Sequence, residues 1–303
     1  MKKNKIVRAV LIFVTVLIII NFALGRILLE GVNKFYGLNQ FSEVLMIGHS
    51  MLMLSVDKEM LENKTELSVS KYTREGVNVI DRYTMTKQYL ESPYSDSLKY
   101  VLYGVDQFTF VGSGLSENSY KLFYPFMDND VINDYVKISE DTKLDYFIHK
   151  VFSLTRYSDV LINASQRGWR GDYSNLKKGT LDIESLKMQM ETGTSHHNRA
   201  ITIDENLLVV FDETLKMITD RGVNVILVQT PVVDVLNEVD KDGYAKVANI
   251  FTSYTENNEL IEYWDLNYKF SSDYSLFFDA IHLNPKGQRE ITEEVIKRIN
   301  DRL

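Results

Sequence analysis

The sequence predicts an α/β fold built on a mostly parallel sheet, because short apolar runs alternate with stretches of helical periodicity. Such a sheet is covered by helices on both faces. The chain has 303 residues, which suits one large α/β domain or two small ones. Its hydrophobic and charged fractions, 45% and 25%, are those of an ordinary globular protein. We expect the ligand crevice at the carboxyl ends of the strands.

Five apolar runs are candidate strands, and two later stretches repeat apolar residues at helical spacing. The last helix begins cleanly, with Asn284 at the N-cap and Pro285 at the first helical position. The other expected helix covers residues 206–219. The candidate strands are Val44–Ile47, Leu67–Ser70, Tyr100–Val105, Val223–Gln229 and Ile261–Leu266.

Composition excludes several classes of function. The net charge of −8 argues against nucleic acid as a partner, since phosphate binding needs a concentrated basic surface. The chain has no cysteine, which rules out disulfides, thiolate nucleophiles and cysteine-ligated metals. We expect neither a cofactor nor a bound metal.

The N-terminus predicts a single membrane anchor. An apolar run extends from Ala9 to Leu24, and with the two apolar residues just before it the segment is long enough to span a bilayer. A basic cluster precedes the run, so residues 1–8 are expected to stay in the cytoplasm and the main domain to lie outside. The expected boundaries are an anchor over 9–25, a stalk over 26–40 and a domain over 41–303. The cluster comprises Lys2, Lys3, Lys5 and Arg8.

A cleaved signal peptide is the alternative for this segment. Residues 23–25, Ala-Leu-Gly, would then be a poor small-residue cleavage site. The apolar run is longer than the roughly 7–15 residues of a signal-peptide core, which favours the uncleaved anchor. Either outcome exports the domain.

An aromatic-rich segment over about residues 107–200 does not fit the simple alternation. We expect it to be an insertion packed over the mouth of the crevice, where Trp169 and Arg170 suit a sugar-binding rim. A satellite hydrophobic core is the alternative for most of its aromatic residues. His196 and His197 are expected in a polar loop or beside the crevice in contact with substrate, because no ligand spacing supports a metal there.

Two short stretches carry the candidate chemistry. Residues 48–50, Gly-His-Ser, follow the first strand, and Asp279 and His282 are three residues apart just before the last helix. In a tight turn, such spacing brings the carboxylate to imidazole Nδ1 and leaves Nε2 free as a base. A serine hydroxyl is a poor nucleophile until such a base removes its proton. Ser50 with this pair would form an acyl-transfer triad; the alternative is a serine that caps a helix and an unrelated histidine.

These stretches resemble the motifs of the SGNH (GDSL-like) hydrolase superfamily. Its serine block is matched by residues 48–50, its central glycine by Gly76, its third block by Gly104 to Asp106, and its last block by Asp279 to His282. The resemblance spans residues 41–303. It implies a flavodoxin-like, three-layer α/β/α sandwich and an oxyanion hole formed by the backbone amides of Ser50 and Gly76.

Two positions depart from the family pattern. His49 replaces the usual aspartate before the serine, and as a further expectation it contacts substrate. Asp106 replaces the asparagine that normally donates to the oxyanion, and an ionised aspartate cannot donate. Either Asp106 is held protonated, or another group such as Asn78 donates, or the hole uses amides alone. A catalytically inactive member of the family is a further alternative.

The combination of one anchor with an exported domain resembles the DltD-like, AlgJ-like and PatB-like proteins of cell-surface acylation systems. The resemblance implies an acyl donor supplied through a multispanning membrane-bound acyltransferase. It also implies a polysaccharide or cell-wall polymer as acceptor. We therefore expect an extracytoplasmic acyltransferase, specifically one that O-acetylates a cell-surface polymer or exopolysaccharide through an acyl-serine intermediate. A carbohydrate esterase and a non-catalytic scaffold of an export complex are the alternatives.

Overall fold

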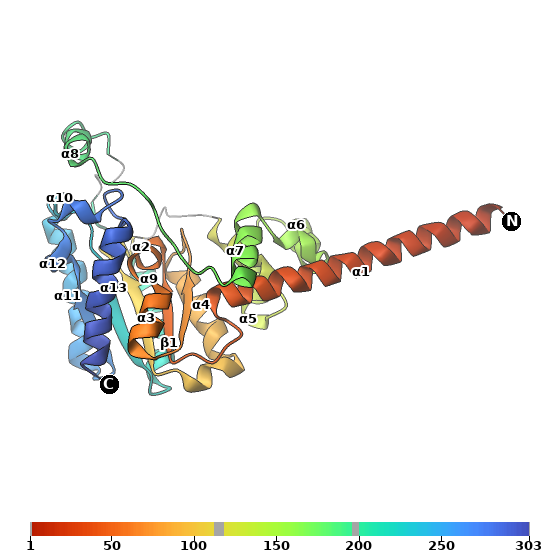
Figure 1. The fold of residues 1–303 in the computed structure, drawn as a ribbon, viewed down its shortest axis with the longest axis horizontal. Coiled ribbons are helices and arrows are strands. Elements are labelled where there is room, and N and C mark those ends of the chain that lie inside the picture. Colours follow the sequence, from red (N-terminus) through yellow and green to blue (C-terminus); the bar gives the residue numbers. More distant parts are fainter. Residues whose placement is uncertain (1, 112–117, 196–199, 303) are drawn as a thin grey trace. The chain divides into compact units, whose positions relative to one another are not determined.

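The fold of the chain is shown in Figure 1 as a computed structural model, which describes residues 2–111, 118–195 and 200–302. The chain divides into two compact units. Residues 1–36 and 118–172 form what we call the helical unit. Residues 37–117 and 173–303 form the sheet unit, which contains all five of the strands predicted above.

The sheet unit is built on five parallel strands in the order β2-β1-β3-β4-β5. This is the flavodoxin-like order, in which ligands bind where the strand order reverses, between β1 and β3. The expected α/β class and sheet type are confirmed. The strands are β1 Val44–Gly48, β2 Val69–Thr73, β3 Tyr100–Val105, β4 Asn224–Gln229 and β5 Ile261–Asp265.

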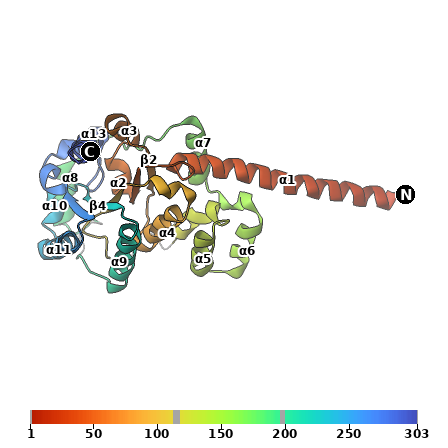
Figure 2. The ribbon, with the colours of Figure 1, turned by 90° about the horizontal axis from the view of Figure 1, so that it is seen from below.

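Helices cover both faces of this sheet. Figure 2 shows α3 and α13 on one side and α4, α9 and α11 on the other. The helices of the sheet unit are α2 Ser50–Ser55, α3 Lys58–Thr65, α4 Val79–Leu90, α8 Ile183–Glu191, α9 Glu205–Thr219, α10 Asp234–Asn237, α11 Lys241–Asn257, α12 Asn267–Phe270 and α13 Pro285–Asn300. Two 3-10 turns, η1 Pro93–Ser97 and η4 Tyr274–Leu276, complete it.

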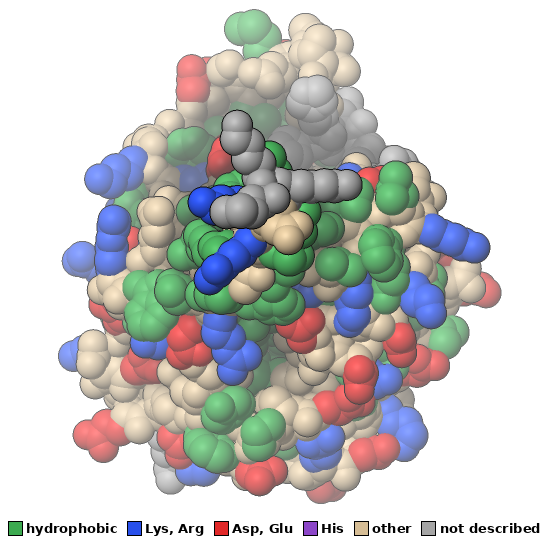
Figure 3. All heavy atoms as spheres, turned by 90° about the vertical axis from the view of Figure 1, so that its right-hand side faces the viewer, with side chains coloured by type: hydrophobic (Ala, Val, Ile, Leu, Met, Phe, Trp, Pro, Cys, Tyr) green, Lys and Arg blue, Asp and Glu red, His purple; other side chains and the backbone are tan. Residues whose placement is uncertain are grey.

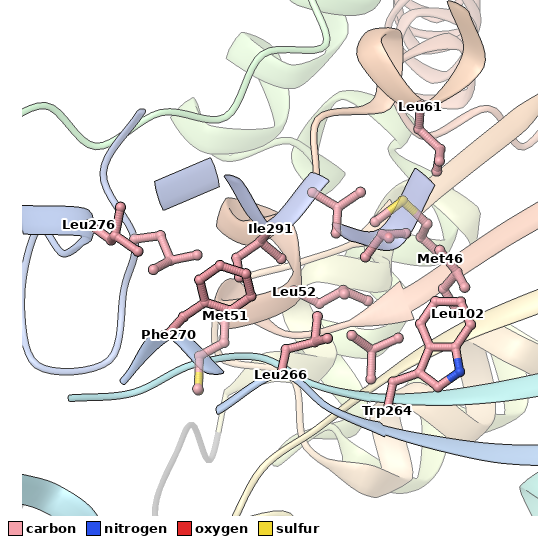
Figure 4. Packing of buried hydrophobic residues seen from close by; sticks show 14 of the residues in the cluster. Met46, Met51, Leu52, Leu61, Leu102, Trp264, Leu266, Phe270, Leu276 and Ile291 are labelled. Carbon is pink, nitrogen blue, oxygen red and sulfur yellow. The ribbon is translucent and has the colours of Figure 1, made fainter. Parts of the chain in front are cut away.

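Successive side chains along each strand point to opposite faces of the sheet. Met46, Leu102 and Trp264 face the helix α13 and form one buried cluster with Ile291 (Figure 4). Tyr103, one residue further along β3, points to the opposite face. There its ring meets Phe211 of α9 edge-on at 5.4 Å. Burial of both faces explains why β1, β3 and β4 are near-continuous apolar runs.

The helical unit contains one long helix and several short ones. Its elements are α1 Lys2–Tyr36, η2 Ser119–Phe126, α5 Asp130–Ser139, α6 Lys143–Val151, η3 Ser153–Arg156 and α7 Asp159–Arg170. By length and composition, α1 can cross a membrane: its most apolar window has a mean hydropathy of 2.6, and none of that window is buried within the described residues.

The second half of α1 differs from the expected stalk. The helix continues without a break to Tyr36 and packs against α7. Glycines allow this close approach, since a Cβ at Gly168 would lie 1.9 Å from the carbonyl oxygen of Gly31. The indole nitrogen of Trp169 also donates to the carbonyl of Ile27 at 3.0 Å. Packing against α7 therefore orders the residues that follow the apolar run.

The segment over 107–200 is not the single insertion that the sequence suggested. Residues 118–172 belong to the helical unit, whereas residues 173–195 belong to the sheet unit. Several aromatic side chains of the first part, such as Phe123 and Phe126, are buried. They form the core of the helical unit, in agreement with the satellite-core alternative.

Candidate active site

Ser50 lies just beyond the carboxyl end of β1, which pairs with β3. The ligand crevice of this topology is expected between these two strands. Strand β1 ends at Gly48, His49 adopts an extended conformation as the N-cap, and Ser50 is the first residue of α2. Both Gly48 and Gly104 lie against Leu52, and a Cβ at either would come within 2.9 Å of the Leu52 Cβ. The two glycines therefore let α2 pack directly on the ends of β1 and β3.

The loop that carries Asp279 and His282 is fixed by its own hydrogen bonds. Asp279 Oδ1 accepts from the backbone amides of Ile281 at 3.0 Å and His282 at 2.9 Å. A bridge between Phe277 and Leu283 closes the loop. These hydrogen bonds between the Asp279 carboxylate and backbone amides of the same turn hold the carboxylate beside the His282 imidazole.

The described structure brings Ser50, His282 and Asp279 into one chain of contacts. Nε2 of His282 lies 2.9 Å from Oγ of Ser50. Nδ1 of His282 lies 2.8 Å and 3.0 Å from the two carboxylate oxygens of Asp279. A carboxylate at Nδ1 selects the tautomer whose Nε2 is unprotonated, so Nε2 can accept the serine proton.

Access and charge also suit this role. Ser50 is half-buried, and the His282 side chain is 12% exposed. Burial raises the pKa of Asp279, but the hydrogen bond and charge of His282 and two backbone amides outweigh it, so the pKa of this carboxyl lies below its usual value. Asp279 is therefore ionised at neutral pH and can stabilise an imidazolium.

His49 and Asp106, the two departures from the family pattern, form a buried pair. Nε2 of His49 lies 2.5 Å from Oδ2 of Asp106, and both side chains are 6% exposed. Nδ1 of His49 accepts from the backbone amide of Met51 at 3.1 Å, which caps α2. Since Nδ1 accepts this hydrogen bond, it carries no hydrogen itself, and the ring hydrogen is on Nε2, which faces Asp106. This placement does not support His49 as a substrate contact.

Asp106 is held as an anion by its surroundings. Burial raises the pKa of this carboxyl, but its contact with the His49 ring, the charge of Arg82 and the backbone amide of Phe108 lower the pKa by more, so the net shift is downward. Its own backbone amide donates to Thr109 Oγ1 at 2.8 Å. The alternative in which Asp106 is held protonated therefore has no support. The Asp106 carboxylate contacts the His49 ring.

Arg82 is a buried residue that the sequence did not indicate. Its side chain is almost fully buried, and Nη1 donates to the carbonyl oxygen of Gly104 at 2.6 Å. Nε donates to the carbonyl oxygen of Asn78 at 3.2 Å, and the guanidinium lies 5.1 Å from the centre of the Tyr103 ring. Through these hydrogen bonds Arg82 connects the end of β3 with the start of α4. An arginine inside a helix gave no sequence signal, because its contact with the carbonyl oxygen of Gly104 joins residues far apart in the sequence.

Gly76 and Asn78 lie in the connection between β2 and α4, at the same edge of the sheet as Ser50. Gly76 has a φ of +75°, a conformation that favours glycine. Asn78 is the N-cap of α4 and forms a capping box with Asp81. The side-chain oxygen of Asn78 accepts from the backbone amide of Asp81 at 2.9 Å. This capping box fixes the connection between β2 and α4 at the start of the helix.

The remaining expected site residues are not in this group. Trp169 and Arg170 belong to the helical unit. There Nζ of Lys34 lies over the Trp169 ring, 3.8 Å from the ring centre. His196 and His197 lie outside the described residues. Across residues 2–111, 118–195 and 200–302, no group of three or more histidine and acidic side chains is placed to hold a metal ion.

Fold and site together define a class: an α/β/α protein with a Ser-His-Asp arrangement at the carboxyl edge of a parallel sheet. No protein-family model matches the chain, and a search of curated proteins found no match. The chemistry is therefore argued from the geometry of this chain.

Proposed function

We propose that this protein is a membrane-anchored acyltransferase that uses Ser50 as nucleophile, His282 as base and Asp279 as the group that orients the base. The contact of 2.9 Å between His282 Nε2 and Ser50 Oγ is the observation that carries the proposal. A serine side chain is activated when a base lies within hydrogen-bond reach and a third group orients that base.

The proposed reaction has two halves. Ser50 Oγ attacks the carbonyl carbon of the acyl donor while His282 takes the hydroxyl proton, and His282 then gives that proton to the leaving group. A sugar hydroxyl next attacks the acyl-serine ester with His282 as base, and the proton returns to Ser50. The backbone amides of Ser50 and Gly76 are the proposed donors to the oxyanion, since the Asp106 carboxylate cannot donate.

The proposed setting is the outer face of a cell membrane. The basic residues before the apolar run of α1 favour a cytoplasmic N-terminus, which places the rest of the chain outside. An anchor raises the effective concentration of the domain near a membrane-bound source of acyl groups. A multispanning acyltransferase as donor and a cell-surface polysaccharide as acceptor are proposed on the resemblance to exported acylation proteins of the SGNH type.

The His49–Asp106 pair weakens the case for a non-catalytic scaffold. That alternative depends on an aspartate that faces and repels a developing oxyanion. Here the carboxylate contacts His49 and the amide of Phe108, so its charge is balanced by local partners. Asp106 is therefore compatible with a working site.

The test is turnover of p-nitrophenyl acetate by the full chain in detergent, with and without an oligosaccharide acceptor. A transferase releases p-nitrophenol faster when the acceptor is present, and mass spectrometry finds acetylated acceptor. An acceptor with no effect on rate, together with removal of acetyl groups from an acetylated oligosaccharide, would identify an esterase instead.

Two variants serve as controls for this test. Ser50→Ala is expected to abolish turnover, whereas Ser253→Ala, on the exposed surface of α11, is expected to leave it unchanged. Equal rates for wild type and Ser50→Ala would refute the proposal and favour a scaffold.

A further inference from the structure

Helix α6 has an unusual arrangement of apolar residues. Leu144, Phe147, Ile148 and Val151 are spaced to lie on one face of the helix. A helix with such a face normally buries it against the protein core. Here none of residues 143–151, all of which the structure describes, is buried. Leu144 is 67% exposed and Phe147 is 58% exposed.

The polar residues of α6, and not the apolar ones, contact the rest of the helical unit. Tyr146 donates to Asn133 Oδ1 at 2.9 Å, and the ring of His149 stacks on Tyr124 with centroids 4.1 Å apart. Lys150 Nζ donates to the carbonyl of Met127 at 2.7 Å. The helix is thus attached by its polar side, so its apolar face points outward.

The helix α6 also lies next to the apolar run of α1. It leads directly into η3, whose Ser153 Oγ donates to the carbonyl oxygen of Asn21 at 2.7 Å. Tyr157, just beyond η3, donates to the carbonyl of Gly25 at 3.0 Å. A bilayer core of about 30 Å needs about 20 helical residues, so a span that starts near Ile6 ends near Gly25. The end of α6 therefore lies where α1 would leave the bilayer.

Charges at this position suit lipid headgroups. A cavity of about 330 Å³ between α1 and the α6–η3 segment is lined by Arg26 and Lys150, together with Arg156, which pairs with Asp128. Figure 3 looks toward the N-terminal end of α1, and apolar side chains gather at the centre of this view. Cations beside exposed apolar residues are typical of helices that lie in a membrane interface.

We propose that α6 is an interfacial helix, which lies in the headgroup region of the leaflet at which α1 leaves the bilayer. Leu144, Phe147 and Val151, with Phe152 directly after the helix, contact the acyl chains of this leaflet. Lys150 and Arg26 lie at the level of the lipid phosphates. The occupant of the apolar face is thus lipid, because the face is continuous with a helix that can itself cross the membrane.

The consequence is a second membrane attachment besides the span. A chain held by a single spanning helix can rotate and tilt relative to the bilayer. A helix in the interface fixes how deep the unit that carries it lies in the membrane. This inference does not depend on the proposed acyl transfer, nor on which side of the membrane the domains lie.

The absence of cysteine from the chain makes the test direct. Single-cysteine variants Phe147→Cys and Val151→Cys place a reporter on the apolar face, and Asp145→Cys places one on an exposed polar position of the same helix. Each full chain is labelled with an environment-sensitive fluorophore and reconstituted as one copy per nanodisc of 3:1 phosphatidylcholine and phosphatidylglycerol.

Labels at 147 and 151 are expected to emit at shorter wavelength than the label at 145 and to be strongly quenched by spin-labelled lipid. Water-like emission at 147 and 151 in these nanodiscs would overturn the proposal. Shielding that appears only in native membranes, or only with two copies in one nanodisc, would also overturn it, since the occupant would then be a protein.

Discussion

At the scale of single residues, the proposed mechanism requires the contact between Asp279 and His282 for the activation of Ser50. Asp279→Asn keeps the shape but removes the charge, and the amide favours the wrong tautomer of His282. We expect turnover of an activated ester to fall by about 10⁴, as in other triads, with a much smaller loss of stability because the asparagine keeps an acceptor oxygen in the loop. Steady-state kinetics and a urea titration measure the two effects. Asp301→Asn, on an exposed residue at the end of α13, is the control.

The buried pair of His49 and Asp106 predicts a difference between two substitutions. Asp106→Ala leaves the buried His49 Nε2–H without the carboxylate that it faces at 2.5 Å, which costs about 1–3 kcal/mol. Asp106→Asn keeps an acceptor oxygen at that place and is expected to cost less. The urea midpoints of the two variants test this order. Equal loss in both would show that the charge, not the hydrogen bond, stabilises the pair.

The pKa of Asp106 also predicts how stability depends on pH. Because this pKa is lower in the folded chain than the usual value of about 3.9, the carboxylate adds stability at higher pH that is lost as pH falls through and below that value. The advantage of wild type over Asp106→Asn in the free energy of unfolding should therefore shrink between pH 6 and pH 3.5. A constant difference would contradict the assignment of Asp106 as an anion.

Short motifs were sufficient to select Ser50, Asp279 and His282, which the structure brings into contact, because a turn of three residues and a strand end are local features. The contact between His49 and Asp106 was not predicted. It forms only when β1 and β3 pair, and single-sequence patterns do not encode which side chains face each other across a sheet edge. Arg82 was missed for the same reason.

At the scale of elements, the start of α13 holds the loop of Asp279 and His282. Gly287 lies in its first turn, and a Cβ there would come 2.2 Å from the carbonyl oxygen of Leu276. Gly287→Ala should therefore displace the loop, with a stability loss of about 1–3 kcal/mol and a larger relative loss of ester turnover. Kinetics and urea unfolding are compared with Glu290→Ala, an exposed position on the same helix. Unchanged turnover would show that the loop does not depend on this contact.

The contact between α1 and α7 gives a second prediction for an element. Gly168→Ala places a methyl group on the backbone of Gly31, which separates the two helices. Residues 118–172 should then be cleaved faster by trypsin in the full chain in detergent. Asn163→Ala, exposed on α7, is the matched control and should be cleaved at the wild-type rate. Equal cleavage of both variants would contradict the close packing.

Periodicity explains which elements could be predicted. All five strands and the two expected helices of the sheet unit were found within a few residues, because β1, β3 and β4 are apolar runs between helical stretches and these helices have a regular apolar stripe. The continuation of α1 past residue 25 was not predicted, since it depends on tertiary packing through Gly31 and Gly168. The boundary between the two units was missed as well, because contacts between residues far apart in sequence define it.

At the scale of the whole molecule, the two units are expected to depend differently on α1. The helical unit uses α1 as a structural helix, through the hydrogen bonds of Ser153, Tyr157 and Trp169 to its backbone. The sheet unit has its own core on both sheet faces. A chain that begins at Leu38 should therefore keep slow amide exchange in the strands but lose protection over residues 118–172. Retained protection there would show that α1 is dispensable for the helical unit.

The central claim, that Ser50 is the nucleophile, is tested most directly by the mass of the full chain after brief incubation with p-nitrophenyl acetate and acid quenching. The account predicts a mass gain of one acetyl group that maps to Ser50 in the peptide digest and is absent from Ser50→Ala. A folded wild-type chain that gains no acetyl group, or gains it equally in the variant, would contradict the account.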